Sequence, residues 1–314
     1  MLQNYSAVKK LLIICLLFAA NFKIEAQPLE KALSFLDFPY DSTYIEDYGR
    51  ALLVKPIVAY RSFSYRLNSI DSDELSVFRP QATIYGGVGG AYKNLQLQLI
   101  FPVGTVNSTD LEANDFRATD ISLGLKTNSL NGALTYKQFQ GFTLNAGTAN
   151  EQLLPDAKLM RLGLKGFYSF NSSYSVNSAY KQTQRQKRQA GSFLLGADAF
   201  YLENNYDETL NELYNFSLIA GYAYNFIPHK KWYISPIFFA GAGLQHPKSL
   251  SSNLSEKEFS LLYDLRLSTG YNSKKLIAGF IFHYENNTLF SDPAHYGMRS
   301  LFLKFNIAYR FVFE

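Results

Sequence analysis

The last segment of the chain has an apolar residue at every second position. The series consists of Leu301, Leu303, Phe305, Ile307, Tyr309, Phe311 and Phe313. Lys304, Asn306 and Arg310 lie between these residues. Successive side chains of a β-strand point to opposite faces, so one face of this segment is apolar and the other carries two cations and an amide. Such a strand either covers a soluble core with its apolar face or, in an outer-membrane barrel, presents that face to lipid around a polar lumen.

The same alternation recurs along the rest of the chain. Strand-like series begin at Leu95, Ile121, Leu162, Phe216 and Phe259. A period of two that is repeated this often indicates long antiparallel strands. After Glu30 no segment has a comparable helical period, and no apolar run approaches the roughly 20 residues that a membrane-spanning helix needs. The pattern therefore predicts an all-β fold.

The connections between these segments alternate between short and long. Short, turn-like connections fall near residues 92–94, 128–131, 171–173, 228–231 and 272–275. Long polar connections fall at residues 69–76, 104–117, 143–158, 247–257 and 286–297. Aromatic residues gather beside the short turns, namely Tyr224, Phe226, Trp232, Tyr233, Tyr271, Tyr309, Phe311 and Phe313. Short periplasmic turns, long outer loops and an aromatic girdle are typical of membrane barrels. We therefore predict a transmembrane antiparallel up-and-down β-barrel, with a soluble β-sandwich as the alternative.

The number of strands follows from the segments that alternate. Thirteen strand-like segments begin at Ala51, Thr83, Leu95, Thr119, Ala133, Leu159, Ser175, Phe193, Phe216, Trp232, Phe259, Leu276 and Leu301. Single-chain bacterial barrels close with an even number of strands. Two longer connections follow each other between Ser175 and Phe216, so either one segment there leaves the wall or a further strand is hidden. We predict about 12 strands, with 14 as the alternative.

The N-terminal residues are typical of an exported protein. Lys9 and Lys10 precede an apolar stretch, and Ala26 ends a plausible cleavage site, which together predict a signal peptide over residues 1–26. A retained membrane anchor is the alternative, but the apolar stretch is short for one. Residues 27–50 are expected to form a periplasmic lead-in, partly helical around Leu29 to Leu36. The barrel is expected to occupy residues 51–314.

Composition excludes several functional classes. The formal net charge of +4 is too small to indicate a nucleic-acid partner. The only cysteine is Cys15, inside the predicted signal peptide, so the mature chain offers no disulfide, Cys-bound zinc or Cys nucleophile. Asp71, Asp73 and Glu74 resemble the start of a calcium loop, but Ser76 stands where that loop requires glycine. We expect neither a metal nor a cofactor.

The histidines offer the weak candidates for catalysis. His229, His246, His283 and His295 are the four histidines, and none has a serine two residues away in the spacing that a strand-borne nucleophile and base would need. His283 shares a strand face with Glu285, so these two residues are candidates for a general base and the group that orients it. A pair of polar residues near the barrel rim is the alternative interpretation.

One tract fits neither face of a membrane strand. Residues 182–192 combine Gln184 with the cations Arg185, Lys187 and Arg188 among further amides. Because neither face is apolar, this tract cannot lie in the wall against lipid. It must lie beyond the bilayer or fold into the lumen. These four residues are candidates for binding anionic groups, such as lipopolysaccharide phosphates at the rim or a solute in the lumen. A solvated charged loop is the alternative.

The same tract carries a resemblance to a known family. The runs 136–142, 154–156 and 184–194, the opening run 41–45 and the later run 221–224 resemble an uncharacterised Bacteroidota family, the domain of unknown function 4421. The resemblance covers nearly the whole mature chain, although Gln189 stands where that family leads us to expect serine. It implies an outer-membrane barrel, and it implies no activity, ligand or catalytic residue.

Three functions are open on these grounds. The first is a non-enzymatic barrel that binds or passes a small solute or lipid, with the basic tract lining or plugging the lumen. The second is a structural or surface-interaction barrel that acts through its long loops. The third is a lipid-modifying membrane enzyme around His283. In each case we expect a protein of the Gram-negative outer membrane, exported by its signal peptide, inserted by the barrel-assembly machinery and surrounded by outer-membrane lipid.

Overall fold

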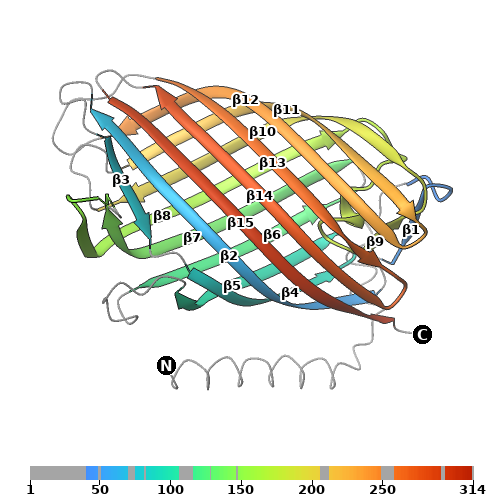
Figure 1. Cartoon of the computed structure of the whole chain (residues 1–314). Coiled ribbons are helices and arrows are strands. Elements are labelled where there is room, and N and C mark those ends of the chain that lie inside the picture. Colours follow the sequence, from blue (N-terminus) through green and yellow to red (C-terminus); the bar gives the residue numbers. More distant parts are fainter. Residues whose placement is uncertain are drawn as a thin grey trace, which may run out of the picture. The chain divides into compact units, whose positions relative to one another are not determined.

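The alternating segments close into an antiparallel β-barrel in the computed structural model of the chain (Figure 1). The structure describes residues 40–48, 51–69, 75–80, 83–105, 116–127, 129–145, 148–205, 212–248, 258–290 and 294–312. Within these residues, twelve strands form the wall, and the last pairs with the first to close the ring. The predicted fold class and the count of 12 strands are confirmed.

The wall strands follow one another around the barrel in sequence order. They are β2 (Ala51–Ser69), β4 (Thr83–Tyr92), β5 (Leu95–Thr105), β6 (Arg117–Lys126), β7 (Leu130–Leu144), β8 (Gln152–Ser169), β10 (Ala190–Asn204), β11 (Glu212–His229), β12 (Trp232–Lys248), β13 (Glu258–Asn272), β14 (Leu276–Phe290) and β15 (Ala294–Val312). Each pairs with its neighbours antiparallel, and β15 pairs with β2 from Val312 opposite Ala51 to Ala294 opposite Ser69.

The alternation assigns the two faces of the wall as predicted. On β13, Leu265 is 41 % exposed whereas the adjacent Asp264 is fully buried. On β15, Phe305, Ile307 and Tyr309 are likewise exposed, whereas the interleaved Lys304, Asn306 and Arg310 are buried. The apolar stripe therefore faces outward and the polar residues face the lumen. This is the inverse of a soluble barrel, in which the apolar side chains point inward.

Four of the five predicted short connections are confirmed, whereas the one predicted at residues 171–173 is wrong, because these residues begin the long connection from β8 to β10. Several of the predicted long connections are shorter than expected. The turns between β4 and β5, β11 and β12, and β13 and β14 occupy two or three residues at one end of the barrel, hereafter the short-turn end. At the other end, β8 begins at Gln152 and β14 extends to Phe290, both inside segments that we expected to be loops. Strands that continue past the apolar band explain the difference, because backbone pairing does not require an apolar face.

Two short strands lie outside the ring. β3 (Leu75–Pro80) pairs with the far end of β2 and with β7, and alternation did not predict it. β1 (Ile45–Asp47) lies in the predicted lead-in and pairs with β9 (Gln184–Gln186), forming a separate two-stranded sheet. Figure 1 shows β1 and β9 together at the short-turn end.

Of the thirteen strand-like segments, the one that begins at Ser175 leaves the wall, which is one of the two predicted solutions. Residues 171–189, hereafter the plug, connect β8 to β10 and contain the 3-10 helix η2 (Val176–Ser178) and β9. Every residue from Tyr174 to Gln184 is buried. Residues 182–184 of the basic tract therefore lie inside the barrel, whereas residues 187–189 are exposed. The prediction that the tract stays out of the wall is wrong for residues 190–192, which begin β10.

Buried apolar side chains of the described residues form three clusters, of which the smallest consists of Leu53, Ala91, Ile277 and Ala308. Toward the short-turn end, Tyr174, Val176, Ala179 and Tyr180 of the plug pack against inward-facing residues such as Phe239. Toward the opposite end, aromatic and aliphatic side chains from at least eight strands form a second cluster. Its members include Tyr65, Phe78, Tyr85, Phe116, Phe139, Phe142, Leu159, Phe200, Leu202, Leu213 and Met298.

Several expectations lie outside the described residues. The predicted signal peptide, the helical stretch within the lead-in and the carboxylates Asp71, Asp73 and Glu74 belong to this group. In the parts of the chain that are described, no helix has the length and apolar character needed to cross a membrane.

Candidate functional site: a charged chamber in the lumen

A cavity of about 210 Å³ lies in the lumen between the plug and the apolar cluster. Val176 and Tyr180 of the plug line it on one side, and Phe302 and Arg61, next to the apolar cluster, line it on the other. Most of its remaining lining is polar or charged. We refer to this cavity as the chamber. It is the place in the described structure where inward-facing charges from many strands converge.

One side of the chamber is an ion-pair network centred on Asp264. The Asp264 carboxylate lies 2.6 Å from Lys165 Nζ on β8 and 2.5 Å from Arg266 Nη2 on its own strand. Lys165 also lies 3.2 Å from Asp198 on β10. Arg161, four residues before Lys165 on β8, lies 3.0 Å from Glu285 on β14. These charges are shielded from water, so the pairs are much less screened than surface ion pairs.

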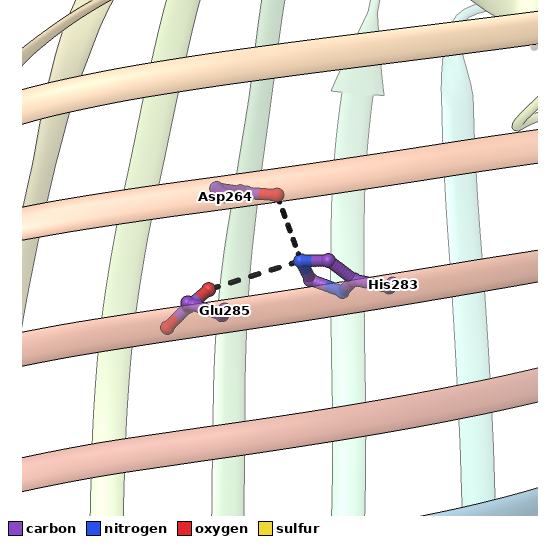
Figure 2. A group of neighbouring side chains, drawn as sticks. All are labelled: Asp264, His283 and Glu285. Atoms are coloured by element: carbon purple, nitrogen blue, oxygen red, sulfur yellow. Dashed lines mark ion pairs between the residues drawn. The ribbon is translucent and has the colours of Figure 1, made fainter.

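His283 belongs to this network and faces the lumen (Figure 2). Its Nε2 lies 3.0 Å from Asp264 Oδ1 and 3.9 Å from Glu285 Oε2. The partner that we expected from sequence, Glu285, is thus the more distant carboxylate. The register of β13 and β14 places Asp264 opposite Glu285 and Arg266 opposite His283, so Asp264 is a diagonal cross-strand neighbour of His283. Lipid would contact the opposite face of β14, so the imidazole does not face a lipid substrate.

The same three residues have the composition of a metal site. Ligand atoms of Asp264, His283 and Glu285 all lie within 4.8 Å of one another. However, Lys165 and Arg266 already occupy the Asp264 carboxylate, and Arg161 occupies Glu285. These three cationic side chains would repel a divalent cation, which could bind the carboxylates only by displacing them. The donor set therefore fits an ion-pair network better than a metal centre.

The other side of the chamber is richer in cations. Arg61 on β2 forms a buried ion pair with Asp120 on β6, and its guanidinium lies 4.7 Å from the centre of the Phe302 ring. Lys126, Lys137 and Lys304 also line the chamber. Lys304 Nζ donates to Gln98 Oε1 at 3.0 Å. Among the described residues, none of these three lysines forms an ion pair with a carboxylate.

Inward-facing asparagines hold the plug by its backbone. Asn272 Nδ2 donates to the carbonyls of Ser178 and Gln184 at 2.8 and 2.9 Å. Asn225 Nδ2 donates to the Ser175 carbonyl at 2.9 Å. These bonds satisfy buried carbonyl groups that would otherwise be costly. The plug is therefore fixed by specific polar contacts as well as by apolar packing.

Arg310 on β15 also binds the backbone of the plug. Its Nε and Nη2 donate to the Gln182 carbonyl, with the Nε distance at 3.1 Å, and Nη2 also donates to Asn272 Oδ1 at 2.8 Å. Its guanidinium lies 4.2 Å from the centre of the Tyr48 ring. Gln182 has φ of 70°, a left-handed conformation that a residue with a side chain rarely adopts without support. Arg310 supplies part of that support.

Replacement of Arg310 by leucine is expected to loosen the plug without preventing formation of the wall. The change removes donors to the Gln182 carbonyl, while the outward face of β15 stays unaltered. Faster amide hydrogen exchange in residues 174–186, with unchanged exchange in β13, would be the expected result. Arg299→Leu, on the same strand at an exposed position, is the matched control and should leave plug exchange unchanged.

Three of the four residues predicted to bind anions contact residues 40–48, which we call the N-terminal segment. Arg185 Nη2 lies 2.5 Å from Glu46 Oε2, and Lys187 Nζ donates to the Ser42 carbonyl at 2.5 Å. Arg188 lies 5.7 Å from the centre of the Tyr44 ring, and the Gln184 side chain accepts a bond from Ser175 Oγ at 2.5 Å. All four lie at the short-turn end and outside the chamber lining. Binding of anions by these residues stays a prediction.

Lys181 and Asp41 are among the groups of this region that have shifted pKa values. Burial, together with the nearby charge of Lys126, lowers the pKa of Lys181 to about 6, so this plug lysine carries little charge at neutral pH. Hydrogen bonds from the Thr43 hydroxyl and amide lower the pKa of Asp41 and keep it ionised. Asp41 also accepts a bond from the Ser173 hydroxyl at 3.1 Å, which connects the N-terminal segment to the plug.

Sequence reasoning identified His283 and Glu285 but missed the other members of the chamber. Asp264, Arg161, Lys165 and Asp198 each stand on the polar face of an alternating strand, which is the available signal. Alternation shows that such residues face the lumen, but it does not show their relative height, that is, their positions along the barrel axis. Height depends on register between strands, and register is set by tertiary pairing.

The architecture defines the class of protein. A closed antiparallel barrel with an apolar exterior, a polar lumen, and short turns gathered at one end is the arrangement of outer-membrane β-barrels. Residues 39–311 match the domain of unknown function DUF4421, and the chain belongs to this family. None of the curated proteins matches the chain in sequence.

Among the solved structures that match the chain are a translocator domain, an outer membrane protease and a porin. The translocator domain of the autotransporter NalP from Neisseria meningitidis is 13% identical, with a TM-score of 0.40 and coverage of 94% of this chain and 97% of that one. The outer membrane protease OmpT from Escherichia coli is 6% identical, with a TM-score of 0.35 and coverage of 85% and 98%. The KdgM porin, in complex with disordered oligogalacturonate, is 8% identical, with a TM-score of 0.28 and coverage of 81% and 99%.

Proposed function

We propose that this protein is a non-enzymatic, plugged barrel of the Gram-negative outer membrane that binds a small polar solute in its chamber. Passage of that solute would require the plug to move. The observation that carries the proposal is the chamber itself, a polar cavity between the plug and the apolar cluster. An open pore would need a continuous aqueous path, whereas the plug fills the lumen toward the short-turn end.

The proposed location rests on the outward face of the wall. Large apolar side chains cover it on every wall strand from β4 to β15. Acyl chains are the medium that such a face fits, and the short turns would then lie in the periplasm. Export by the predicted signal peptide, insertion by the barrel-assembly machinery and a Bacteroidota source belong to the same proposal.

A reversible cross-link between the plug and the N-terminal segment tests whether the plug moves. Glu46 and Arg185 are directly opposite partners in the antiparallel pair of β1 and β9. Such partners have Cα atoms roughly 4.5–5.5 Å apart, within the range of about 4.4–6.8 Å that a disulfide spans. Because Cys15 is the only cysteine of the sequence, the double variant Glu46→Cys and Arg185→Cys offers one pair of thiols beyond the predicted signal peptide.

The expected result is conductance that depends on the redox state of that pair. In planar bilayers, the oxidised double variant should be silent and the reduced one should show intermittent openings, because reduction leaves the plug without its Glu46–Arg185 ion pair. Each single-cysteine variant should behave identically in both states. Silence of both states, with the plug amides equally protected from exchange, would instead identify a permanently blocked barrel with a structural role.

A further inference from the structure

We propose that the chamber binds a small oxyanion, carrying phosphate or carboxylate groups, through Lys126, Lys137 and Lys304. This inference rests on the proposed function, because it names the chemical class of the solute that the chamber takes. It follows from three observations: an excess of positive charge around the cavity, buried donors that lack acceptors, and the small volume of the cavity.

The charges that line the chamber do not balance. Among the described residues, seven cationic and three acidic side chains line it, and Asp264 lies directly behind the lining. The four carboxylates are engaged by Arg61, Arg161, Lys165 and Arg266. Lys126, Lys137 and Lys304 are then left without a counter-charge. Lys304 is buried, and Lys126 and Lys137 are half-buried. Removing an uncompensated charge from water is unfavourable, and a bound anion would relieve that cost.

These three lysines occupy one side of the barrel. They stand on β6, β7 and β15, whereas Asp198, Asp264 and Glu285 stand on β10, β13 and β14. Asp120 is the acidic residue on the cationic side of the chamber. It forms its ion pair with Arg61, although Lys137 is its directly opposite neighbour on β7. The chamber therefore has a positive side and a more nearly neutral side. An anion would bind against the former.

Buried donors around the cationic side have no acceptor. Asn131 is the cross-strand partner of Lys126, lines the chamber and is 1 % exposed, yet neither its Nδ2 nor its Oδ1 has a hydrogen-bond partner. Arg61 Nε and Nη1 are buried and equally without an acceptor. Lys55 on β2 is fully buried, and its Nζ also lacks one. Buried donors are nearly always satisfied in native proteins, so this group indicates a missing acceptor.

The dimensions of the chamber limit the size of the ligand. Its volume of about 210 Å³ lies below the range of about 300–1,000 Å³ that is typical of pockets for drug-sized molecules. Inorganic phosphate or a short dicarboxylate has the appropriate size. A lipid or an oligosaccharide does not. Oxygen-rich anions also accept several charge-assisted bonds at once, which matches donors that converge from several strands.

Calorimetry with defined anions tests the proposal. The full-length barrel in detergent micelles should bind inorganic phosphate or succinate and should not bind choline. Comparison of the first two probes distinguishes a phosphate site from a carboxylate site. Lys126→Gln should weaken binding of the preferred anion about tenfold, and Lys126→Gln with Lys304→Gln should weaken it further, because each change removes a charge-assisted bond. Lys231→Gln, at an exposed short turn, is the matched control.

A second measurement keeps the test valid if a variant folds poorly. The bound anion should raise the midpoint of thermal unfolding of the unsubstituted barrel, and that increase should be lost in Lys126→Gln. If neither anion binds while the cysteine pair still controls conductance, the oxyanion inference is wrong and the proposed function stands. If no probe binds and the cysteine pair has no effect, both are wrong. Equal affinity in the lysine variants and the control would also overturn the inference.

Discussion

Replacement of Asp264 by asparagine should lower the free energy of unfolding of the barrel by about 3–5 kcal/mol, because it leaves buried cations without their counter-charge. Asp264 is fully buried and lies 2.6 Å from Lys165 Nζ, 2.5 Å from Arg266 Nη2 and 3.0 Å from His283 Nε2. Asparagine keeps the shape of the side chain and removes the charge. The loss therefore reports electrostatics rather than a cavity.

Denaturant unfolding in lipid vesicles would measure this loss. Trp232, the only tryptophan, stands on the outward face at the short-turn end, 53 % exposed, and its fluorescence should report the transition. The double variant Asp264→Asn and Lys165→Met should recover part of the stability, since one of the orphaned cations is then absent. A loss below about 1 kcal/mol for Asp264→Asn, with no recovery in the double variant, would show that water or counter-ions reach this network.

The fold was predictable because its main signal is local. The alternation of Leu301 to Phe313 with Lys304, Asn306 and Arg310 assigns the faces of one strand without knowledge of any other. The even number of strands in such barrels then favoured twelve wall strands over thirteen and placed the irregularity between Ser175 and Phe216, where the segment that begins at Ser175 leaves the wall. That segment is the plug. β3 escaped prediction because it is short and pairs only with the ends of β2 and β7.

The chamber was not predictable because its geometry depends on register and on distant parts of the chain. Arg161 and Glu285 lie far apart in sequence but 3.0 Å apart in the lumen. The basic tract illustrates the same limit. Its composition excluded residues 182–189 from the wall, but it could not show that Arg185 pairs with Glu46 of the lead-in. The sequence pattern shows which polar residues face inward, but it does not show the ion-pair partners that give them a role.

The outward face of β13 allows a direct test of the membrane location. Leu265, next to Asp264 and pointing the other way, stands near the middle of the strand and is opposite Phe238 and Tyr284 on its neighbours. Leu265→Arg should cost roughly 2–4 kcal/mol in a bilayer, because a charge at the midplane must leave water. Refolding into vesicles followed by denaturant titration would measure the change in the free energy of unfolding.

A leucine at a different depth in the membrane provides the control for this experiment. Leu276 begins β14 beside the short turn, and its side chain is as exposed as that of Leu265. Leu276→Arg should therefore cost only about 0–1 kcal/mol, since arginine at the interface reaches water and lipid headgroups. In detergent micelles, whose apolar layer is less well defined, the two costs should converge. Equal costs in the bilayer would mean that the apolar side of the wall does not contact acyl chains, and the membrane location would have to be abandoned.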